Sequence, residues 1–338
     1  MEDNDTSTAA RVPNGPLELE RGALLDGKYV VHRVVRSGGF GTVWCGEHLR
    51  TGAAVAVKVA PKREGVSTLV HEARVMMHIE KNKRVPLPKV RGYGTLQSAP
   101  EYNYLVMDLL GEHLSHRNVM RAYRETTYGA VLPCGGRTRC DDGGDDVTGE
   151  GAGEGGGEAR APDDPVLSMF LADICTQLHQ IVEAIHSTGF IYRDVKPSNF
   201  LFAKTPGVKG RAAVHVVDFG LVKRDAGRGS GRRALDADPV GTPHYMSIDA
   251  HERRQHTRRD DLESLAYLFY YIYHGSVPWA DLHDHRELAA AKRAFRAPEC
   301  LEGLPNVKMY LERVDALDRD GAPNYRALSA ILSYVVVF

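Results

Sequence analysis

The chain has 338 residues, of which 43% are hydrophobic and 26% are charged, a composition typical of globular rather than disordered proteins. Its 43 Lys and Arg residues nearly balance 44 Asp and Glu residues, and this net charge of -1 argues against a protein that mainly coats nucleic acid. Five scattered cysteines without a CxxC pair argue against a disulfide framework. We expect no signal peptide, because the first residues are polar and acidic, and no stretch approaches the roughly 20 apolar residues of a membrane helix. We expect a protein of the cytoplasm or nucleus, with no membrane or nucleic-acid partner.

The predicted elements begin after a polar leader, residues 1–22, which shows no hydrophobic period. Runs of β-branched residues separated by glycines then predict an antiparallel meander, with strands at about residues 29–35, 43–48 and 55–60. Apolar residues at helical spacing follow over residues 69–77, and a further strand is predicted over 104–107.

A segment rich in Gly, Asp and Glu, at about residues 133–165, interrupts the second part of the chain. It lacks the bulky apolar residues of a core, so we interpret it as a flexible acidic insertion between two helices. Helical spacing of apolar residues then predicts an amphipathic helix over residues 166–187 and another helix over 262–274. The sequence from the insertion onward therefore predicts mainly helices and loops.

A glycine cluster lies between the first two predicted strands, in the sequence Ser37-Gly38-Gly39-Phe40-Gly41-Thr42-Val43. The cluster alone is a weak signal, because such sequences also occur in ordinary hairpin turns. A strand with the sequence Val55-Ala56-Val57-Lys58 follows it and strengthens the signal. Glycines let backbone N–H groups approach phosphate oxygens, and a lysine on a strand places a positive charge against them. The two motifs together predict phosphate binding.

Two later motifs give a stronger signal for phosphoryl transfer. Asp194 precedes Asn199 by five residues, and Asp218-Phe219-Gly220 begins 24 residues after Asp194, behind an apolar run. Phosphoryl transfer needs oxygen ligands for Mg²⁺ and a carboxylate aligned with the attacking hydroxyl group. Asp194, Asn199 and Asp218 are the side chains that supply them.

With these motifs the chain resembles the eukaryotic protein kinases from Tyr29 onward. It is similar specifically to the casein kinase 1 superfamily, which includes the tau-tubulin kinases, through the sequence of residues 241–251, which stands where other kinases have Ala-Pro-Glu. Residues 258–267 and the Pro278-Trp279 pair add to this resemblance.

The resemblance implies an α+β, two-lobed kinase fold over residues 23–338. A mostly β lobe would cover about residues 23–107, a hinge 108–111, and a mostly α lobe 112–338, with ATP between the lobes. A monomer is the usual state in this family.

The resemblance also implies roles for individual residues. Lys58, paired with Glu72, would bind the ATP phosphates. Asp194 would orient the substrate hydroxyl group, and Lys196 would touch the transferred phosphate. Asn199 and Asp218 would bind Mg²⁺, and Asp261 would be a structural anchor of the large lobe. The other residues expected to contact ATP, including the gatekeeper Met107, are Val35, Ser37, Gly38, Gly39, Phe40, Gly41, Val43, Ala56, Met107, Asp108, Leu110 and Leu201.

Three positions depart from the family pattern. Arg36 replaces the first glycine of the phosphate loop, and Tyr192 replaces the usual histidine before Arg-Asp, a position that packs under the Asp-Phe-Gly segment. His244 replaces an arginine that in casein kinase 1 helps to hold a phosphate already on the substrate. The predicted function is a non-specific serine/threonine protein kinase. The alternatives are an ATP-binding pseudokinase scaffold, suggested by Arg36 and Tyr192, and a kinase of small molecules on the same fold.

Two basic clusters raise a hypothesis about substrates. They lie in and just after the expected activation segment, and either they favour acidic peptides or they are ordinary solvated loops. The acidic insertion could also fold across them as a pseudosubstrate. The clusters comprise Lys223, Arg224, Arg228, Arg232 and Arg233, and then Arg253, Arg254, Arg258 and Arg259.

Overall fold

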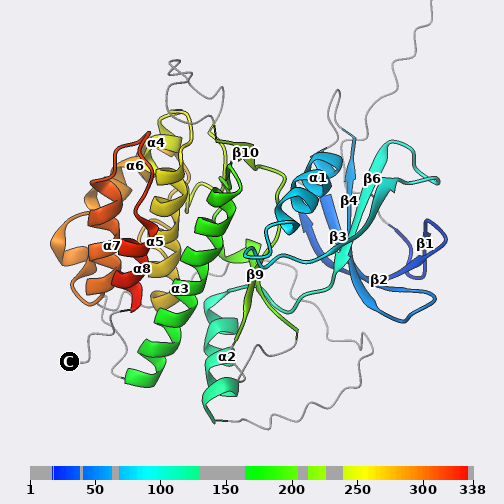
Figure 1. The fold of residues 1–338 in the computed structure, drawn as a ribbon, viewed down its shortest axis with the longest axis horizontal. Coiled ribbons are helices and arrows are strands. Elements are labelled where there is room, and N and C mark those ends of the chain that lie inside the picture. The colour runs from blue at the N-terminus through cyan, green and yellow to red at the C-terminus, as the bar shows by residue number, and fades with distance from the viewer. Residues whose placement is uncertain are drawn as a thin grey trace, which may run out of the picture. The chain divides into compact units, whose positions relative to one another are not determined.

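The computed structural model describes residues 17, 19–38, 41–62, 68–128, 164–204, 212–225 and 239–333. Most of the predicted leader and insertion, together with Gly39 and Phe40, lie outside these residues. The chain divides into two compact units, one of residues 1–77 and 88–109 and the other of residues 78–87 and 110–338 (Figure 1). The division after Leu109 falls within the predicted hinge, whereas residues 78–87 belong to the second unit rather than to the β-rich one.

The first unit is built on a six-stranded antiparallel sheet with the strand order β1-β2-β3-β4-β6-β5. All the predicted strands lie in this sheet, and the predicted helix lies within α1. The elements of this unit are β1 (Leu24–Leu25), β2 (Tyr29–Gly38), β3 (Gly41–His48), β4 (Ala54–Pro61), α1 (Thr68–Glu80), β5 (Val90–Thr95) and β6 (Tyr102–Asp108).

One hydrophobic core lies on one face of this sheet. It contains Val31, Val57 and Val106 from three strands, all completely buried, because alternate residues of a strand point to the same face. Leu17 and Leu19 pack against this core, although both fall within the predicted leader. The packed part of the chain therefore begins before residue 23.

The second unit is mainly helical. Helix α3 packs against α5 and α8, and α5 packs against α7 (Figure 1). Its helices are α2 (His116–Tyr128), α3 (Pro165–Ser187), α4 (Ile248–His251), α5 (Arg258–His274), α6 (His285–Ala294), α7 (Pro305–Asp315) and α8 (Tyr325–Ser333), with short 3-10 turns at Pro197–Asn199 and Pro298–Leu301. No helix in the described part of the chain combines the length and apolar character needed to cross a membrane.

The starts of α3 and α5 follow from their capping residues. The Asp164 side chain accepts hydrogen bonds from the N–H groups of Val166 and Leu167, so α3 begins at the end of the predicted insertion. Thr257 and Asp260 form a capping box. Helix α5 therefore begins at Arg258, four residues before the predicted start.

Two small two-stranded sheets flank the predicted catalytic motifs. Strand β7 (Phe190–Ile191) pairs with β10 (Lys223–Arg224), and β8 (Phe200–Phe202) pairs with β9 (Val214–Val216). The residues between β7 and β8 contain Asp194 and Asn199, and Asp218 follows β9. The two sheets thus bring two motifs that are distant in sequence to one region of the second unit.

Candidate functional site

A buried ion pair lies in the first unit, between β4 and α1. Lys58 Nζ lies 2.8 Å from Glu72 Oε2, and these residues are only 7% and 1% exposed. The alternating pattern of β4 places Val57 in the hydrophobic core and Lys58 on the other face of the strand, toward α1. Lys58 and Glu72 are therefore in contact, as the resemblance implies.

The glycine cluster forms the β2–β3 hairpin, in which Ser37 pairs with Thr42 and Gly38 with Gly41. Gly41 has φ +112°, and a Cβ atom there would lie 2.3 Å from the carbonyl oxygen of Val59. A Cβ atom on Gly38 would meet no atom of the other described residues within 4 Å. Gly41 is therefore required by packing on β4, whereas Gly38 is open to the surroundings.

Other residues expected to contact ATP are placed by the same sheet. Ala56 on β4 pairs with Met107 on β6, and both are buried. Val35 on β2 is exposed and Val43 on β3 is partly exposed. The pairing of β4 with β6 thus places Ala56 beside the expected gatekeeper.

The expected hinge residues Asp108 and Leu110 differ in their backbone hydrogen bonds. Asp108 donates its N–H to the carbonyl of Lys89, and its carboxylate accepts from Arg91 Nε at 2.6 Å. The backbone of Leu110 has no hydrogen-bond partner among the described residues. Of these two residues, Leu110 has the backbone groups that remain available to a ligand.

Asp194 is the centre of a hydrogen-bond cluster in the second unit. Its Oδ2 atom lies 2.8 Å from both Lys196 Nζ and Asn199 Nδ2, and its Oδ1 accepts a bond from Thr242 Oγ1 at 2.9 Å. Asn199 Nδ2 also bonds to the Asp194 carbonyl. These contacts hold a buried carboxylate in one orientation beside a lysine. The contact with Thr242 was not predicted from the sequence, which offered only the family motif around that residue.

The β8–β9 hairpin brings Asn199 and Asp218 to the same end. Phe200 pairs with Val216, and the N–H of Val217 donates to the Asn199 carbonyl at 2.9 Å. Asp218 follows directly, with a left-handed backbone at φ +63°. Leu201, the next residue of β8, is partly exposed. The register therefore places the two expected magnesium ligands near each other.

Tyr192 packs where the resemblance implies. The side chain is completely buried, its hydroxyl group donates to the Val217 carbonyl at 2.6 Å, and its ring meets Phe219 edge-on at 5.8 Å. Burial raises the pKa of Tyr192 well above 10, so the hydroxyl group stays a neutral donor. The tyrosine thus supports the Asp-Phe-Gly segment directly.

Three groups in the second unit meet at the carboxylate of Asp261 on α5. It accepts bonds from the N–H groups of Tyr192 and Arg193 and contacts His186 Nε2 at 2.8 Å. His186 Nδ1 contacts the Tyr325 hydroxyl group of α8 at 2.7 Å. Because the carboxylate can only accept, His186 Nε2 donates to it. The anchoring role expected for Asp261 agrees with these contacts.

A buried lysine beside the casein-kinase-like segment was missed from the sequence. Lys292 on α6 is completely buried, and its Nζ lies 2.7 Å from the Pro243 carbonyl and 2.6 Å from the Met246 carbonyl. His244, between them, contacts the Leu282 carbonyl through Nε2 at 3.2 Å. Nothing in the local pattern predicts Lys292, because lysines are rarely buried.

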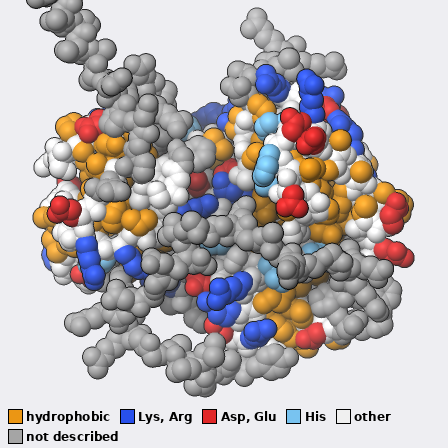
Figure 2. Space-filling view, turned by 180° about the vertical axis from the view of Figure 1, so that it is seen from behind, with side chains coloured by type: hydrophobic (Ala, Val, Ile, Leu, Met, Phe, Trp, Pro, Cys, Tyr) orange, Lys and Arg blue, Asp and Glu red, His pale blue; other side chains and the backbone are white. Residues whose placement is uncertain are grey.

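The second basic cluster is largely engaged in ion pairs. Arg254 pairs with Asp249 and Glu252, Arg258 with Asp225, and Arg259 with Asp249 and Asp315, whereas Arg253 is exposed. Figure 2 shows basic and acidic side chains interspersed over one face of the described residues. These pairs favour a structural role for Arg254, Arg258 and Arg259. Arg228, Arg232 and Arg233 of the first cluster lie outside the described residues.

Comparison with known proteins agrees with this geometry. The protein kinase domain family model matches residues 165–313. The chain is 29% identical to casein kinase I homolog 2 of Schizosaccharomyces pombe over 91% of this chain and 62% of that protein. It is 25% identical to casein kinase I homolog 1 of Saccharomyces cerevisiae, over 98% of this chain and 55% of that protein.

A third relative, from Dictyostelium discoideum and named "Probable serine/threonine-protein kinase", is 27% identical over 92% of this chain and 54% of that protein. The chain thus spans between half and two thirds of the length of these relatives. These comparisons show that residues 165–313 match the protein kinase domain model and that the chain is similar to casein kinase I homologues over most of its length.

Proposed function

We propose that the chain is a serine/threonine protein kinase that transfers the γ-phosphoryl group of Mg-ATP to protein substrates. The cluster around Asp194 carries this proposal. Its carboxylate is held by Asn199 and Thr242, with Lys196 beside it. Such a site offers one group that orients a hydroxyl and one positive charge for the transferred phosphate.

The other expected residues fit the same chemistry. In the first unit, Glu72 holds the amino group of Lys58, which would bind ATP phosphates. In the second unit, Asn199 and Asp218 offer the oxygen donors that Mg²⁺ prefers, at one end of the β8–β9 hairpin. Bound Mg-ATP supplies the phosphoryl group and neutralises its charge. The placement of ATP between the lobes stays a prediction.

A scaffold without turnover is the alternative raised by Tyr192 and Arg36. The contacts of Tyr192 with Val217 and Phe219 favour the enzyme, because they support the segment that bears Asp218. Serine and threonine are proposed as acceptors because Lys196 is typical of that kinase class. The preference for acidic peptides, the monomeric state and the cytoplasmic or nuclear location also stay predictions.

The test is transfer of labelled phosphate from Mg-ATP to casein and to the chain itself. We expect transfer by the native chain, with label on Ser or Thr, and none by Asp194→Asn or Asp218→Asn. Asp320→Asn is the matched control, because Asp320 is an exposed aspartate away from the cluster. Equal signals from the native chain and the two site variants would contradict an active kinase.

A further inference from the structure

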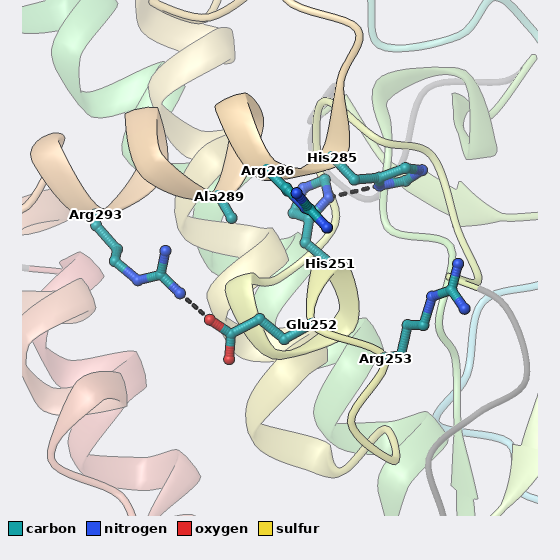
Figure 3. Close-up of a pocket in the computed structure, with 7 residues that line it drawn as sticks. All are labelled: His251, Glu252, Arg253, His285, Arg286, Ala289 and Arg293. Atoms are coloured by element: carbon teal, nitrogen blue, oxygen red, sulfur yellow. Dashed lines mark hydrogen bonds and ion pairs between the residues drawn. The ribbon is translucent and has the colours of Figure 1, made fainter.

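A hollow of about 370 Å³ lies between the end of α4 and one face of α6 (Figure 3). It is lined by His251 from α4 and by His285 and Ala289 from α6. None of the residues of the Asp194 cluster lines it. Its volume lies within the range of natural ligand sites, and the short side chain of Ala289 leaves room for a ligand.

Basic side chains outnumber acidic ones around this hollow. Arg253, Arg286 and Arg293 line it with a single carboxylate, that of Glu252. Glu252 is already paired with Arg293, as Figure 3 shows, and lies 2.9 Å from Arg254 on its other oxygen. Arg253 and Arg286 are exposed, and neither forms an ion pair with a described carboxylate. Two guanidinium groups of the lining are therefore outside the ion pairs formed among the described residues.

The acidic residue before α6, Asp284, forms no ion pair with Arg286. Backbone N–H bonds lower the pKa of Asp284, and the nearby charge of Arg286 adds a smaller effect. Asp284 is the N-cap of α6, and its Oδ1 accepts from the N–H groups of Arg286 and Glu287 at 2.8 and 3.1 Å. The arrangement uses the backbone of Arg286 and leaves its guanidinium group free to contact a ligand.

Hydrogen bonds link the two histidines to each other and to Lys292. Lys292 Nζ lies 2.8 Å from His251 Nε2, and His251 Nδ1 lies 2.8 Å from His285 Nδ1 (Figure 3). Burial and the charge of Lys292 lower the pKa of His251 to about 3, so its ring is neutral. Burial also lowers the pKa of Lys292, but its three acceptor neighbours, Pro243, Met246 and His251, match the three donors of the ammonium form.

The contact between the two histidines uses one nitrogen of each ring. His251 Nδ1 and His285 Nδ1 form it, and Lys292 Nζ contacts the other nitrogen of His251, Nε2. His285 Nε2 has no hydrogen-bond partner among the described residues. The hollow therefore combines two guanidinium groups that are in no ion pair among the described residues with a histidine nitrogen that is available to a ligand.

We propose that this hollow binds the phosphoryl group of a phosphorylated peptide segment, through Arg253, Arg286 and His285. Guanidinium groups match phosphate oxygens in geometry and charge, and two of them balance a phosphate dianion. Nucleic acid is disfavoured because no Phe, Tyr or Trp lines the hollow to stack on bases. The site is separate from the proposed catalytic residues, so its occupancy is measured by binding and not by turnover.

The experiment compares two fluorescein-labelled peptides, Gly-Gly-phosphoserine-Gly-Gly and the same peptide with serine, by anisotropy with the full chain and no ATP. We expect the phosphorylated peptide to bind about tenfold more tightly or better. Arg286→Gln should weaken its binding about tenfold, and Arg253→Gln with Arg286→Gln should reduce it to the level of the serine peptide. Arg313→Gln, which removes an exposed arginine of α7 outside the hollow, should change nothing.

Several results would overturn the proposal. Equal binding of the two peptides would do so, as would unchanged binding by the double variant at an unchanged melting temperature. Competition by inorganic phosphate at the same concentration as the peptide would assign the hollow to the free anion instead. Tighter, Arg286-dependent binding of a single-stranded oligonucleotide would assign it to nucleic acid.

Discussion

The Asp261 carboxylate accepts a hydrogen bond from the backbone N–H of Arg193 at a distance of 2.8 Å. Arg193 has φ +69°, in the left-handed region that residues other than glycine seldom adopt. Gly241 also lies close to this residue, since a Cβ atom on Gly241 would lie 2.8 Å from the Arg193 carbonyl oxygen. The conformation just before Asp194 is therefore held by α5 and by the segment that follows Asp-Phe-Gly.

Replacing Asp261 with Asn is expected to disturb this loop. The amide keeps one acceptor oxygen but places an NH₂ group where a backbone N–H or His186 now points. The unfolding free energy should fall by about 2–4 kcal/mol, since hydrogen bonds to buried charges are lost. Chemical denaturation measures the loss, with Asp320→Asn as the control. Unchanged stability would show that the carboxylate does not hold the loop.

Replacing one partner of the buried ion pair in the first unit should lower the free energy of unfolding more than replacing both partners. Lys58→Met leaves the carboxylate of Glu72 buried without its lysine, with an expected loss of about 3–5 kcal/mol. Lys58→Met combined with Glu72→Met should recover part of that loss. Urea unfolding of these two variants and of Glu72→Met alone checks this. Losses that simply add would rule out a direct coupling between the two residues.

The two glycines of the β2–β3 hairpin should respond differently to alanine. Gly41→Ala forces a left-handed alanine and a clash with the Val59 carbonyl, so the melting temperature should fall by several degrees, corresponding to about 2 kcal/mol or more. Gly38→Ala meets open space and should leave stability nearly unchanged. If Gly38 lies close to ATP phosphates, its variant should instead raise the KM for ATP. Equal melting temperatures for the two variants would contradict the packing argument.

Acid should destabilise the second unit through His179. Burial lowers the pKa of His179 to about 4, while Nε2 donates to the Tyr325 carbonyl and Nδ1 accepts from the Tyr310 hydroxyl group. The unfolded chain takes up this proton first, near pH 6.5, so stability is complete above that pH and falls toward pH 4. The contribution is on the order of 3 kcal/mol.

His179→Gln tests this pH dependence, because a glutamine amide can accept from one partner and donate to the other without titrating. The variant should show a flatter decrease in unfolding free energy between pH 6.5 and 5 than the native chain. An identical decrease would show that other groups cause the acid sensitivity.

The strands and long helices could be predicted because their patterns are local. A run of β-branched residues predicts β4, where Val57 enters the core and Lys58 points to the other face, and helical spacing predicts α3. The candidate site could be predicted from spacing, since Asp194 and Asn199 lie on one short loop. The bond from Thr242 to Asp194 could not, because it joins residues 48 positions apart.

The arginines of the second basic cluster show why the partners of charged side chains could not be predicted from the sequence. Arg258 and Arg259 look alike in sequence, yet Arg258 pairs with Asp225, before α4, and Arg259 pairs with Asp315, at the end of α7. Arg253 remains exposed a few residues earlier. Whether a charged side chain faces a partner or solvent depends on tertiary contacts that no local pattern contains.

Because Lys292 is buried against residues 243–246, its chemical reactivity reports whether this segment is in place. An amine with all three donors in hydrogen bonds to Pro243, Met246 and His251 is shielded from acylating reagents until those bonds separate. The rate at which Lys292 becomes acetylated, compared with the exposed Lys28, therefore records how often this segment detaches from α6.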